Sequence, residues 1–254
     1  MTNIRNVAVI GSGLMGHAIA QVFSRGGCRV KIHDLNDELL AGAMNRIKSN
    51  LRRLVENGLE DETAIDGIMS RITLTTKLQD AVADAEFVTE CIPEDLKLKV
   101  ELFSLLESMA PPHAILASNT SMLRISDIGK PITDKSRALV THWFNPPHLI
   151  PVVEVVKGPD TSPETVERMI SFLGEMGKEP VRVLKEVPGH LVNRIQFALN
   201  REMLGLLEQG VASPEEIDKA VSLSFALRLV ASGPLKTIDI NGIDLFYYGM
   251  REIY

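Results

Sequence analysis

The sequence predicts an α/β protein whose sheet is doubly wound and mainly parallel, followed by a smaller all-helical C-terminal domain. Short β-branched runs alternate with longer stretches of helical periodicity over the first two thirds of the chain. This alternation is typical of βαβ units, which build a parallel sheet covered by helices on both faces. After Pro188 no strand pattern of useful length follows. We therefore expect one domain at residues 1–187 and a second at residues 188–254.

The individual elements of the first domain follow from local periodicity, β-branched runs and turn residues. The expected strands are residues 6–10, 29–34, 86–90, 114–117, 138–142, 151–156 and 181–184. The expected helices are residues 14–25, 37–57, 61–71, 95–109 and 163–176. Segment 37–71 holds two amphipathic stretches where one crossover helix would suffice. Its cations form either a solvated helix face or a flap over an anionic substrate.

The second domain is expected to begin with one long helix at residues 190–209, where leucine, isoleucine and alanine recur at helical intervals. A further helix start follows at Ser213, which is a typical N-cap residue. Pro214 then occupies the first helical position, and Glu216 lies three residues after the cap. These residues predict helices and give no indication of a second sheet.

Composition and charge exclude several classes of protein. The net charge of −6 argues against a nucleic-acid-binding protein that works through a general basic surface. Cys28 and Cys91 are too few for a disulfide framework, lack the spacing of metal ligands, and are typical of a reducing compartment. No uninterrupted apolar stretch reaches the roughly 18 residues needed to span a bilayer. We expect a cytoplasmic protein without a metal, membrane or nucleic-acid partner.

A glycine-rich turn follows the first expected strand and opens the first expected helix. Such a turn brings backbone N–H groups and the positive end of a helix dipole to a pyrophosphate. Asp34 ends the next strand, where a carboxylate can bond the ribose hydroxyls, and no arginine follows to meet a 2′-phosphate. The sequence thus predicts a Rossmann-type site for NAD rather than NADP. The expected cofactor contacts are Gly11, Gly13, Leu14, Met15, Gly16 and Asp34.

His142 and Glu154 are the candidate acid–base pair. His142 closes an expected strand, at the edge where ligands bind in open parallel sheets. Glu154 lies within an otherwise apolar strand, where an unpaired carboxylate is costly to bury. A histidine partner would remove that cost, and the carboxylate would orient the imidazole as a general base. The alternatives are a packed core histidine for His142 and a water-facing edge-strand position for Glu154.

Five segments together give the sequence a family resemblance. The sequence resembles the NAD-dependent 3-hydroxyacyl-CoA dehydrogenase family from about residue 4 onward. The matching segments are ECIPEDLKLK at 90–99, ASNTS at 117–121, HWFNPP at 142–147, VEVV at 153–156 and VPGHLVNR at 187–194. The resemblance implies a homodimer, built largely through the helical domain, and a role in fatty acid metabolism.

The resemblance also implies a role for each matching residue. His142 is expected to take the proton from the C3 hydroxyl, with Glu154 as its partner, while hydride passes from C3 to NAD. Ser121 and Asn193 are expected to hold the substrate oxygen and to support the histidine. The residues implied to contact the nicotinamide ribose and ring are Glu94, Lys99 and Asn145. The expected substrate is a short 3-hydroxyacyl-CoA such as 3-hydroxybutyryl-CoA.

Some segments depart from this pattern and keep other substrates open. Lysines that coenzyme A-dependent relatives often carry near residues 54–58 are replaced here by Glu56 and Asn57. Arg52 and Arg53 are then the expected substrate-binding cations. Other segments resemble dehydrogenases of free hydroxy acids, of the L-gulonate, carnitine and pyridine-carboxylate types. A non-catalytic NAD-binding relative is a further alternative, and the C-terminal domain is expected to be short for the family.

Overall fold

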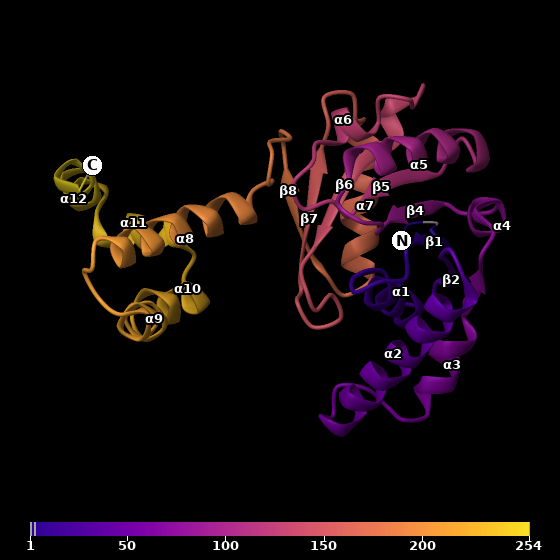
Figure 1. Ribbon diagram of the computed structural model, residues 1–254, viewed down its shortest axis with the longest axis horizontal. Coiled ribbons are helices and arrows are strands. Elements are labelled where there is room, and N and C mark those ends of the chain that lie inside the picture. The colour runs from indigo at the N-terminus through magenta and orange to yellow at the C-terminus, as the bar shows by residue number, and fades with distance from the viewer. Residues whose placement is uncertain (1, 3, 254) are drawn as a thin grey trace. The chain divides into compact units, whose positions relative to one another are not determined.

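The structure is a computed structural model that describes residue 2 and residues 4–253. Its centre is one eight-stranded sheet in the order β3-β2-β1-β4-β5-β6-β7-β8 (Figure 1). All neighbouring strands are parallel except β6 and β7, which confirms the expected mainly parallel sheet. The strands are β1 Asn6–Ile10, β2 Arg29–His33, β3 Ile72–Thr75, β4 Phe87–Glu90, β5 Ile115–Ser118, β6 Ala138–Trp143, β7 Val152–Lys157 and β8 Glu179–Val183.

Helices cover both faces of the sheet, as a doubly wound fold requires. The helices of this region are α1 Gly16–Arg25, α2 Asp37–Glu56, α3 Ala64–Ser70, α4 Leu78–Val82, α5 Leu96–Met109, α6 Ile125–Ile128 and α7 Pro163–Glu175, with a 3₁₀ turn at Lys135–Arg137. Buried side chains of α1, α2, α3 and α7 share one hydrophobic cluster, and those of α4, α5 and α6 share a second. The two clusters contain alternate residues of the same strands, so each lies on its own face of the sheet.

The structure corrects one expectation about segment 37–71. This segment is the crossover between β2 and β3, because Ile72–Thr75 forms a parallel strand beside β2. Sequence reasoning missed β3, since a four-residue edge strand with polar threonines carries little periodicity. The two helices α2 and α3 therefore form an ordinary βαβ connection rather than a surplus insertion.

Side-chain caps fix several of the expected helix starts. Asn36 accepts a hydrogen bond from the Leu39 amide at 2.9 Å and begins α2. Ser213 accepts one from the Glu216 amide at 3.3 Å and begins α9, as predicted. Such caps each stabilise a helix by about 1 kcal/mol. The α2 cap also fixes the backbone directly after Asp34.

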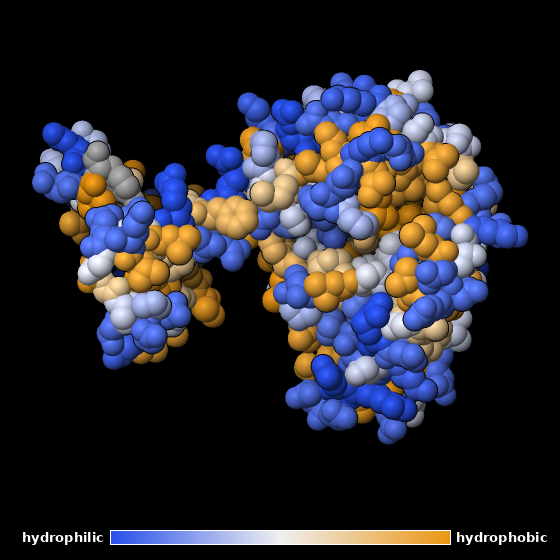
Figure 2. Space-filling view, viewed as in Figure 1, coloured by the Kyte–Doolittle hydropathy of each residue, from blue (hydrophilic) through white to orange (hydrophobic). Residues whose placement is uncertain are grey.

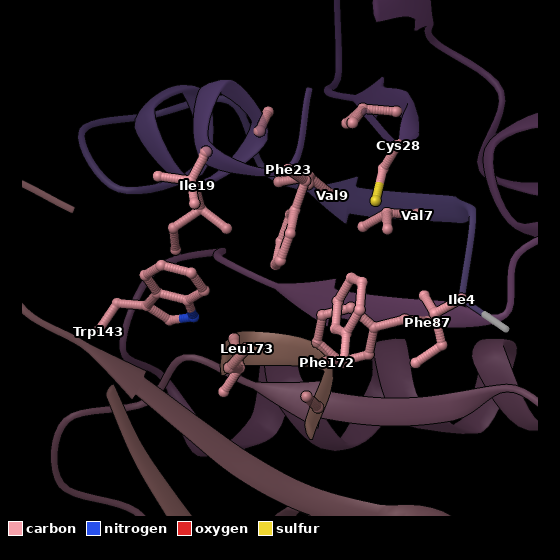
Figure 3. Close-up of a cluster of buried hydrophobic side chains, with 14 of the residues drawn as sticks. Ile4, Val7, Val9, Ile19, Phe23, Cys28, Phe87, Trp143, Phe172 and Leu173 are labelled. Atoms are coloured by element: carbon pink, nitrogen blue, oxygen red, sulfur yellow. The ribbon is translucent and has the colours of Figure 1, made fainter. Parts of the chain in front are cut away.

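An aromatic cluster in the core connects α1 with the functional end of the sheet (Figure 3). Phe23 on α1 stacks on Phe172 of α7 with ring centroids 5.5 Å apart. It also packs edge-on against Phe87 at 5.7 Å and Trp143 at 5.5 Å. Edge-to-face pairs of this kind add about 0.5–1.5 kcal/mol beyond their buried area. The cluster therefore holds Trp143, and with it the end of β6, against the helix that follows the glycine turn.

The chain divides into two compact units, Met1–Arg194 and Ile195–Tyr254. The sequence placed this boundary after residue 187. The second unit is helical in its described residues and contains most of α8 Val192–Glu208 together with α9 Pro214–Leu223, α10 Phe225–Ala231, α11 Pro234–Asn241 and α12 Ile243–Ile253. It exposes many apolar side chains, including Val230 and Leu235. Figure 2 shows hydrophobic residues on the surface of this unit. No helix in the described part of the chain is long and apolar enough to cross a membrane.

Candidate functional site

The glycine turn joins β1 to α1 with a geometry that excludes side chains. Gly11 has a φ of +97°, in the left-handed region, and a Cβ there would lie 2.7 Å from the carbonyl oxygen of Cys91. A Cβ on Gly16 would lie 1.8 Å from the carbonyl oxygen of Gly11. Both glycines are therefore required for helix α1 to start so close to β1 and β4. The free N–H groups of that helix start remain available to an anionic ligand.

Asp34, directly after β2, faces this turn. Its Oδ2 accepts hydrogen bonds from the amide of Ser12 at 2.7 Å and from the hydroxyl of Ser12 at 2.6 Å. The amide of Leu35 donates to Oδ1 at 2.8 Å. Burial opposes ionisation, but these hydrogen bonds outweigh it and hold the pKa of Asp34 below its usual range. Asp34 is thus an ionised acceptor at the position expected for ribose recognition.

A large cavity opens at the carboxyl ends of the strands beside this turn. Its volume is about 990 Å³, which suits a dinucleotide. Its lining includes the predicted cofactor residues Gly11, Gly13, Leu14, Met15, Asp34 and Glu94, together with Asn119 and Ser121. We call it the dinucleotide cavity.

Glu94 and Lys99, both expected to contact the cofactor, take different positions. Glu94 lines the dinucleotide cavity and accepts hydrogen bonds from the Thr120 hydroxyl and from the amides of Ser121 and Met122. Burial opposes its ionisation, but these bonds and Lys99 hold its pKa below the usual range. Lys99 itself is only 1% exposed, so the structure places it beneath the cavity and not in its lining.

The Lys99 ammonium is held between two carboxylates. Its Nζ lies 2.6 Å from Glu90 Oε1 and 3.3 Å from Glu94 Oε2. Burial raises the pKa of Glu90, against the opposing effect of Lys99 and the Ser118 hydroxyl. Lys99 therefore orients Glu94 from beneath the cavity, and it does not line the cavity where it could contact NAD directly.

His142 and Glu154 form a buried pair across β6 and β7. The two residues are register partners in the antiparallel ladder, and His142 Nδ1 lies 2.6 Å from Glu154 Oε2. His142 is 3% exposed and Glu154 is wholly buried. Because β7 lies between β6 and β8, the edge-strand alternative for Glu154 is wrong. An ionised carboxylate can only accept, so the imidazole carries its proton on Nδ1 and leaves the Nε2 lone pair free.

Two backbone amides keep Glu154 ionised. Its Oε1 accepts hydrogen bonds from Leu191 at 3.0 Å and Val192 at 2.9 Å, at the start of α8. Burial favours the protonated acid, but the imidazole and these amides outweigh it and hold the pKa of Glu154 below its usual range. A fixed negative charge behind an imidazole is the arrangement of a general base that must carry a proton for part of a reaction.

The structure brings Ser121 and Asn193 together and places Asn145 elsewhere. The Asn193 Nδ2 donates to the carbonyl oxygen of Ser121 at 3.1 Å. Asn119, which was not singled out in the sequence, lines the dinucleotide cavity, and its Oδ1 accepts from the amide of Trp143 at 3.0 Å. That bond joins the cavity to the residue after His142. Asn145 lines a second cavity instead, among α1, α2 and the β6–β7 loop.

His190 belongs to this site, although it was not among the residues expected there from the sequence. It is wholly buried, has a φ of +51°, and its ring centroid lies 5.3 Å from that of His142. Its Nε2 donates to the carbonyl oxygen of Thr120 at 3.0 Å. Burial lowers its pKa, so it is a neutral neighbour of the dyad. The segment 187–194, which carries part of the family resemblance, was the feature of the sequence that could have pointed to His190.

The two expected substrate-binding arginines separate. Arg53 lines the second cavity, whose volume is about 520 Å³. Arg52 is exposed on α2 and is not part of that lining. Arg53 is exposed as well, and of the two arginines it alone lines a cavity.

A dinucleotide cavity at the carboxyl ends of a doubly wound sheet, beside a buried imidazole–carboxylate pair, defines an NAD-dependent oxidoreductase. The chain matches the family model "3-hydroxyacyl-CoA dehydrogenase, NAD binding domain" over residues 6–187. It matches "3-hydroxyacyl-CoA dehydrogenase, C-terminal domain" over residues 189–254. The chain belongs to the 3-hydroxyacyl-CoA dehydrogenase family, and NAD is its cofactor.

Several relatives show the breadth of this family. Lambda-crystallin of Oryctolagus cuniculus is 35% identical, over 98% of this chain and 80% of the rabbit protein. The 5-formyl-3-hydroxy-2-methylpyridine 4-carboxylate 5-dehydrogenase of Mesorhizobium japonicum is 33% identical, over 96% of this chain and 78% of that protein. The crystal structure of (S)-3-hydroxybutyryl-CoA dehydrogenase from Ralstonia eutropha superposes with a TM-score of 0.84 at 30% identity, over 99% of this chain and 87% of that one.

Proposed function

We propose that the protein oxidises the C3 hydroxyl of a short 3-hydroxyacyl substrate to a ketone, with NAD as acceptor and His142 as general base. The observation that carries this proposal is the 2.6 Å contact between His142 Nδ1 and a buried, ionised Glu154. The pair adjoins the dinucleotide cavity through the hydrogen bond between Asn119 and the amide of Trp143.

Each residue of the site has a defined task in this proposal. His142 Nε2 accepts the hydroxyl proton as the C3–H bond breaks, and Glu154 stabilises the imidazolium that forms. NAD would supply the acceptor for the hydride that leaves C3. Ser121 and Asn193 hold the substrate oxygen near His142, since Asn193 is already tied to Ser121. Glu94 holds the nicotinamide ribose in this proposal, which is supported by its position in the cavity lining and by its contacts with Thr120 and Lys99.

Two substrate classes carry the C3 hydroxyl that this chemistry needs. The family models and the likeness to a 3-hydroxybutyryl-CoA dehydrogenase support a coenzyme A thioester. The lysine-free end of α2 and the likeness to a pyridine-carboxylate dehydrogenase support a free hydroxy acid. The likeness to lambda-crystallin supports a non-catalytic relative, but an intact His142–Glu154 pair speaks against it.

Turnover of matched substrates tests the proposed reaction. We expect the protein to consume NADH in the presence of acetoacetyl-CoA or of free 3-keto acids, read as loss of absorbance at the NADH band. The His142→Ala protein is the control for contaminating activity. Tight NADH binding without turnover on any of these compounds would contradict the proposed activity and support the non-catalytic alternative.

Asp34 should govern cofactor binding. We expect Asp34→Ala to raise the Kd for NADH about 10- to 100-fold, since hydrogen bonds to a charged group contribute about 1.5–3 kcal/mol each. Fluorescence titration of NADH measures the effect. Glu38→Ala, which removes an exposed carboxylate from the first turn of α2, is the matched control. An equal rise in the Kd for NADH in both variants would show that net charge, and not ribose recognition by Asp34, causes the effect.

Two further expectations remain proposals. We propose a homodimer built through the helical unit, supported by the exposed apolar side chains of that unit. We also propose a reducing, cytoplasmic setting, supported by the free thiols of Cys28 and Cys91.

A further inference from the structure

Two backbone amides of the glycine turn, those of Gly13 and Leu14, have no acceptor among the described residues. The amide before them differs, since Ser12 donates to Asp34 Oδ2 at 2.7 Å. Gly13 and Leu14 both line the dinucleotide cavity, and a Cβ on Gly13 would meet no described atom within 4 Å. The two amides are therefore free to donate to an anion in the cavity, such as the pyrophosphate of the cofactor.

The direction of each of these amides follows from the carbonyl group that precedes it. The peptide bonds of the turn are trans. In a planar trans peptide the C=O bond and the following N–H bond point in opposite directions. A group that holds the carbonyl of Ser12 therefore directs the amide of Gly13. A group that holds the carbonyl of Gly13 directs the amide of Leu14 in the same way.

His17, in the first turn of α1, holds the carbonyl of Gly13. Its Nδ1 lies 2.7 Å from that oxygen, and because a carbonyl oxygen can only accept, Nδ1 carries the proton and donates. The backbone amide of His17 lies 3.4 Å from the same oxygen, whereas the helix bond from Ile19 to Met15 measures 2.9 Å. The imidazole is thus the closer of the two donors that fix this carbonyl.

His17 acts from outside the dinucleotide cavity. It lines the second cavity and is not part of the dinucleotide cavity lining. The residue is only 5% exposed. Burial lowers its pKa against the opposing effect of the Gly13 carbonyl, so the ring is a neutral donor. His17 is therefore placed to orient the turn and not to contact the cofactor itself.

Arg46, on α2, holds the other carbonyl. Its Nη2 donates to the carbonyl oxygen of Ser12 at 2.9 Å. The amide and hydroxyl of Ser12 both donate to Asp34, so this residue is held on two sides. Arg46 is exposed, and water competes for its hydrogen bonds. We therefore expect it to contribute less than the buried His17.

We propose that His17 and Arg46 are positioning residues for the pyrophosphate of the cofactor. By holding two carbonyl oxygens they turn the amides of Gly13 and Leu14 into the dinucleotide cavity. Donors that already point at the ligand lose little freedom when it binds, and affinity rises accordingly. The inference concerns cofactor binding alone, so it does not depend on which substrate the protein oxidises.

Two substitutions of His17 test the role of its donor. His17→Leu removes the Nδ1–H group and should raise the Kd for NADH about three- to tenfold, the usual effect of one lost hydrogen bond. His17→Asn carries an amide nitrogen at the δ position, where the histidine carries Nδ1, and should restore most of the affinity. Fluorescence titration of NADH measures both. Wild-type affinity in His17→Leu, or no better binding in His17→Asn, would overturn the inference.

A pair of shorter ligands separates positioning of the amides from general damage to the site. ADP carries a diphosphate and adenosine carries none, and each can be titrated as a competitor of NADH. In His17→Leu we expect the inhibition constant of ADP to rise about three- to tenfold and that of adenosine to stay within about twofold. An equal rise for both ligands would show a structural role only and would overturn the inference.

Arg46→Met tests the second carbonyl. We expect a rise in the Kd for NADH of about two- to fivefold, smaller than that in His17→Leu. Lys48→Met removes an exposed cation from the same helix and is the matched control, for which we expect an unchanged Kd. Equal effects of the two variants would assign the loss to net charge and overturn the role of Arg46. All these measurements are made at equilibrium, so they hold whether or not the proposed substrates are turned over.

Discussion

Replacing His142 with alanine should lower kcat about 10²- to 10⁴-fold, the usual contribution of a positioned general base. The imidazole has its Nδ1 committed to Glu154 at 2.6 Å, so Nε2 is the atom that accepts the substrate proton. The neighbouring His190 donates its Nε2–H to the carbonyl oxygen of Thr120, and its buried Nδ1 has no hydrogen-bond partner in the described residues. Burial lowers the pKa of His190, so we expect it to be a weaker base than His142. Steady-state NADH formation measures the loss.

A lower kcat in His142→Ala identifies a general base only if the variant still binds NADH normally. We expect the Kd for NADH to stay within about twofold, because His142 is not part of the dinucleotide cavity lining. His113→Ala, which removes an exposed histidine, is the matched control and should retain full activity. An unchanged kcat in His142→Ala would show that the base lies elsewhere.

The Glu154→Gln variant should lose about 10²- to 10⁴-fold in kcat, although its shape is nearly unchanged. A glutamine has one acceptor oxygen and one amide donor. If the glutamine oxygen still accepts hydrogen bonds from the Leu191 and Val192 amides, the glutamine NH₂ group faces His142 Nδ1. The imidazole must then move its proton to Nε2, and the base has no lone pair for the substrate. Single-turnover kinetics measures this chemical step directly.

The same variant has a distinct pH signature in stability. The pKa of Glu154 is depressed in the folded protein. Its contribution to the free energy of unfolding is therefore complete above the ordinary carboxyl pKa and is lost as pH falls through the lower folded value. We expect Glu154→Gln to be less stable than wild type at pH 7 and the gap to narrow in acid, measured by urea unfolding. A gap that is independent of pH would contradict the ionised, hydrogen-bonded state; Glu56→Gln, on the surface of α2, is the control.

The sequence predicted those parts of the fold and site that have local causes. The glycine turn requires residues without a Cβ, and the buried Glu154 requires a partner, so both could be read from single positions. Edge strand β3 was missed because four alternating residues carry little information without their neighbour β2. Most predicted strand bounds differ from the structure by one or two residues, as expected where tertiary pairing decides the ends.

Residues whose roles depend on tertiary contacts were less predictable. Lys99 was expected at the cofactor, but its burial between Glu90 and Glu94 depends on strand β4 and helix α5 packing together. His190 lies beside His142 only because the turn between β8 and α8 returns to the segment that follows β5. There His190 bonds Thr120, which lies 70 residues earlier in the chain. Asn145 shares the HWFNPP segment with His142 yet lines the other cavity. Sequence spacing gives the order of such residues, and only the fold gives their neighbours.

The antiparallel pairing of β6 and β7 has a consequence for how this site can change over time. His142 and Glu154 face each other because they are partners in one ladder, and Trp143 and Val153 are the next pair. A slip of that ladder by one residue would turn Glu154 to the opposite face of the sheet and break the pair. Insertions within the connecting loop leave the ladder untouched. The loop that carries Asn145 and His148 lies outside that ladder, so substitutions at its tip can reshape the cavity it lines while His142 and Glu154 keep facing each other.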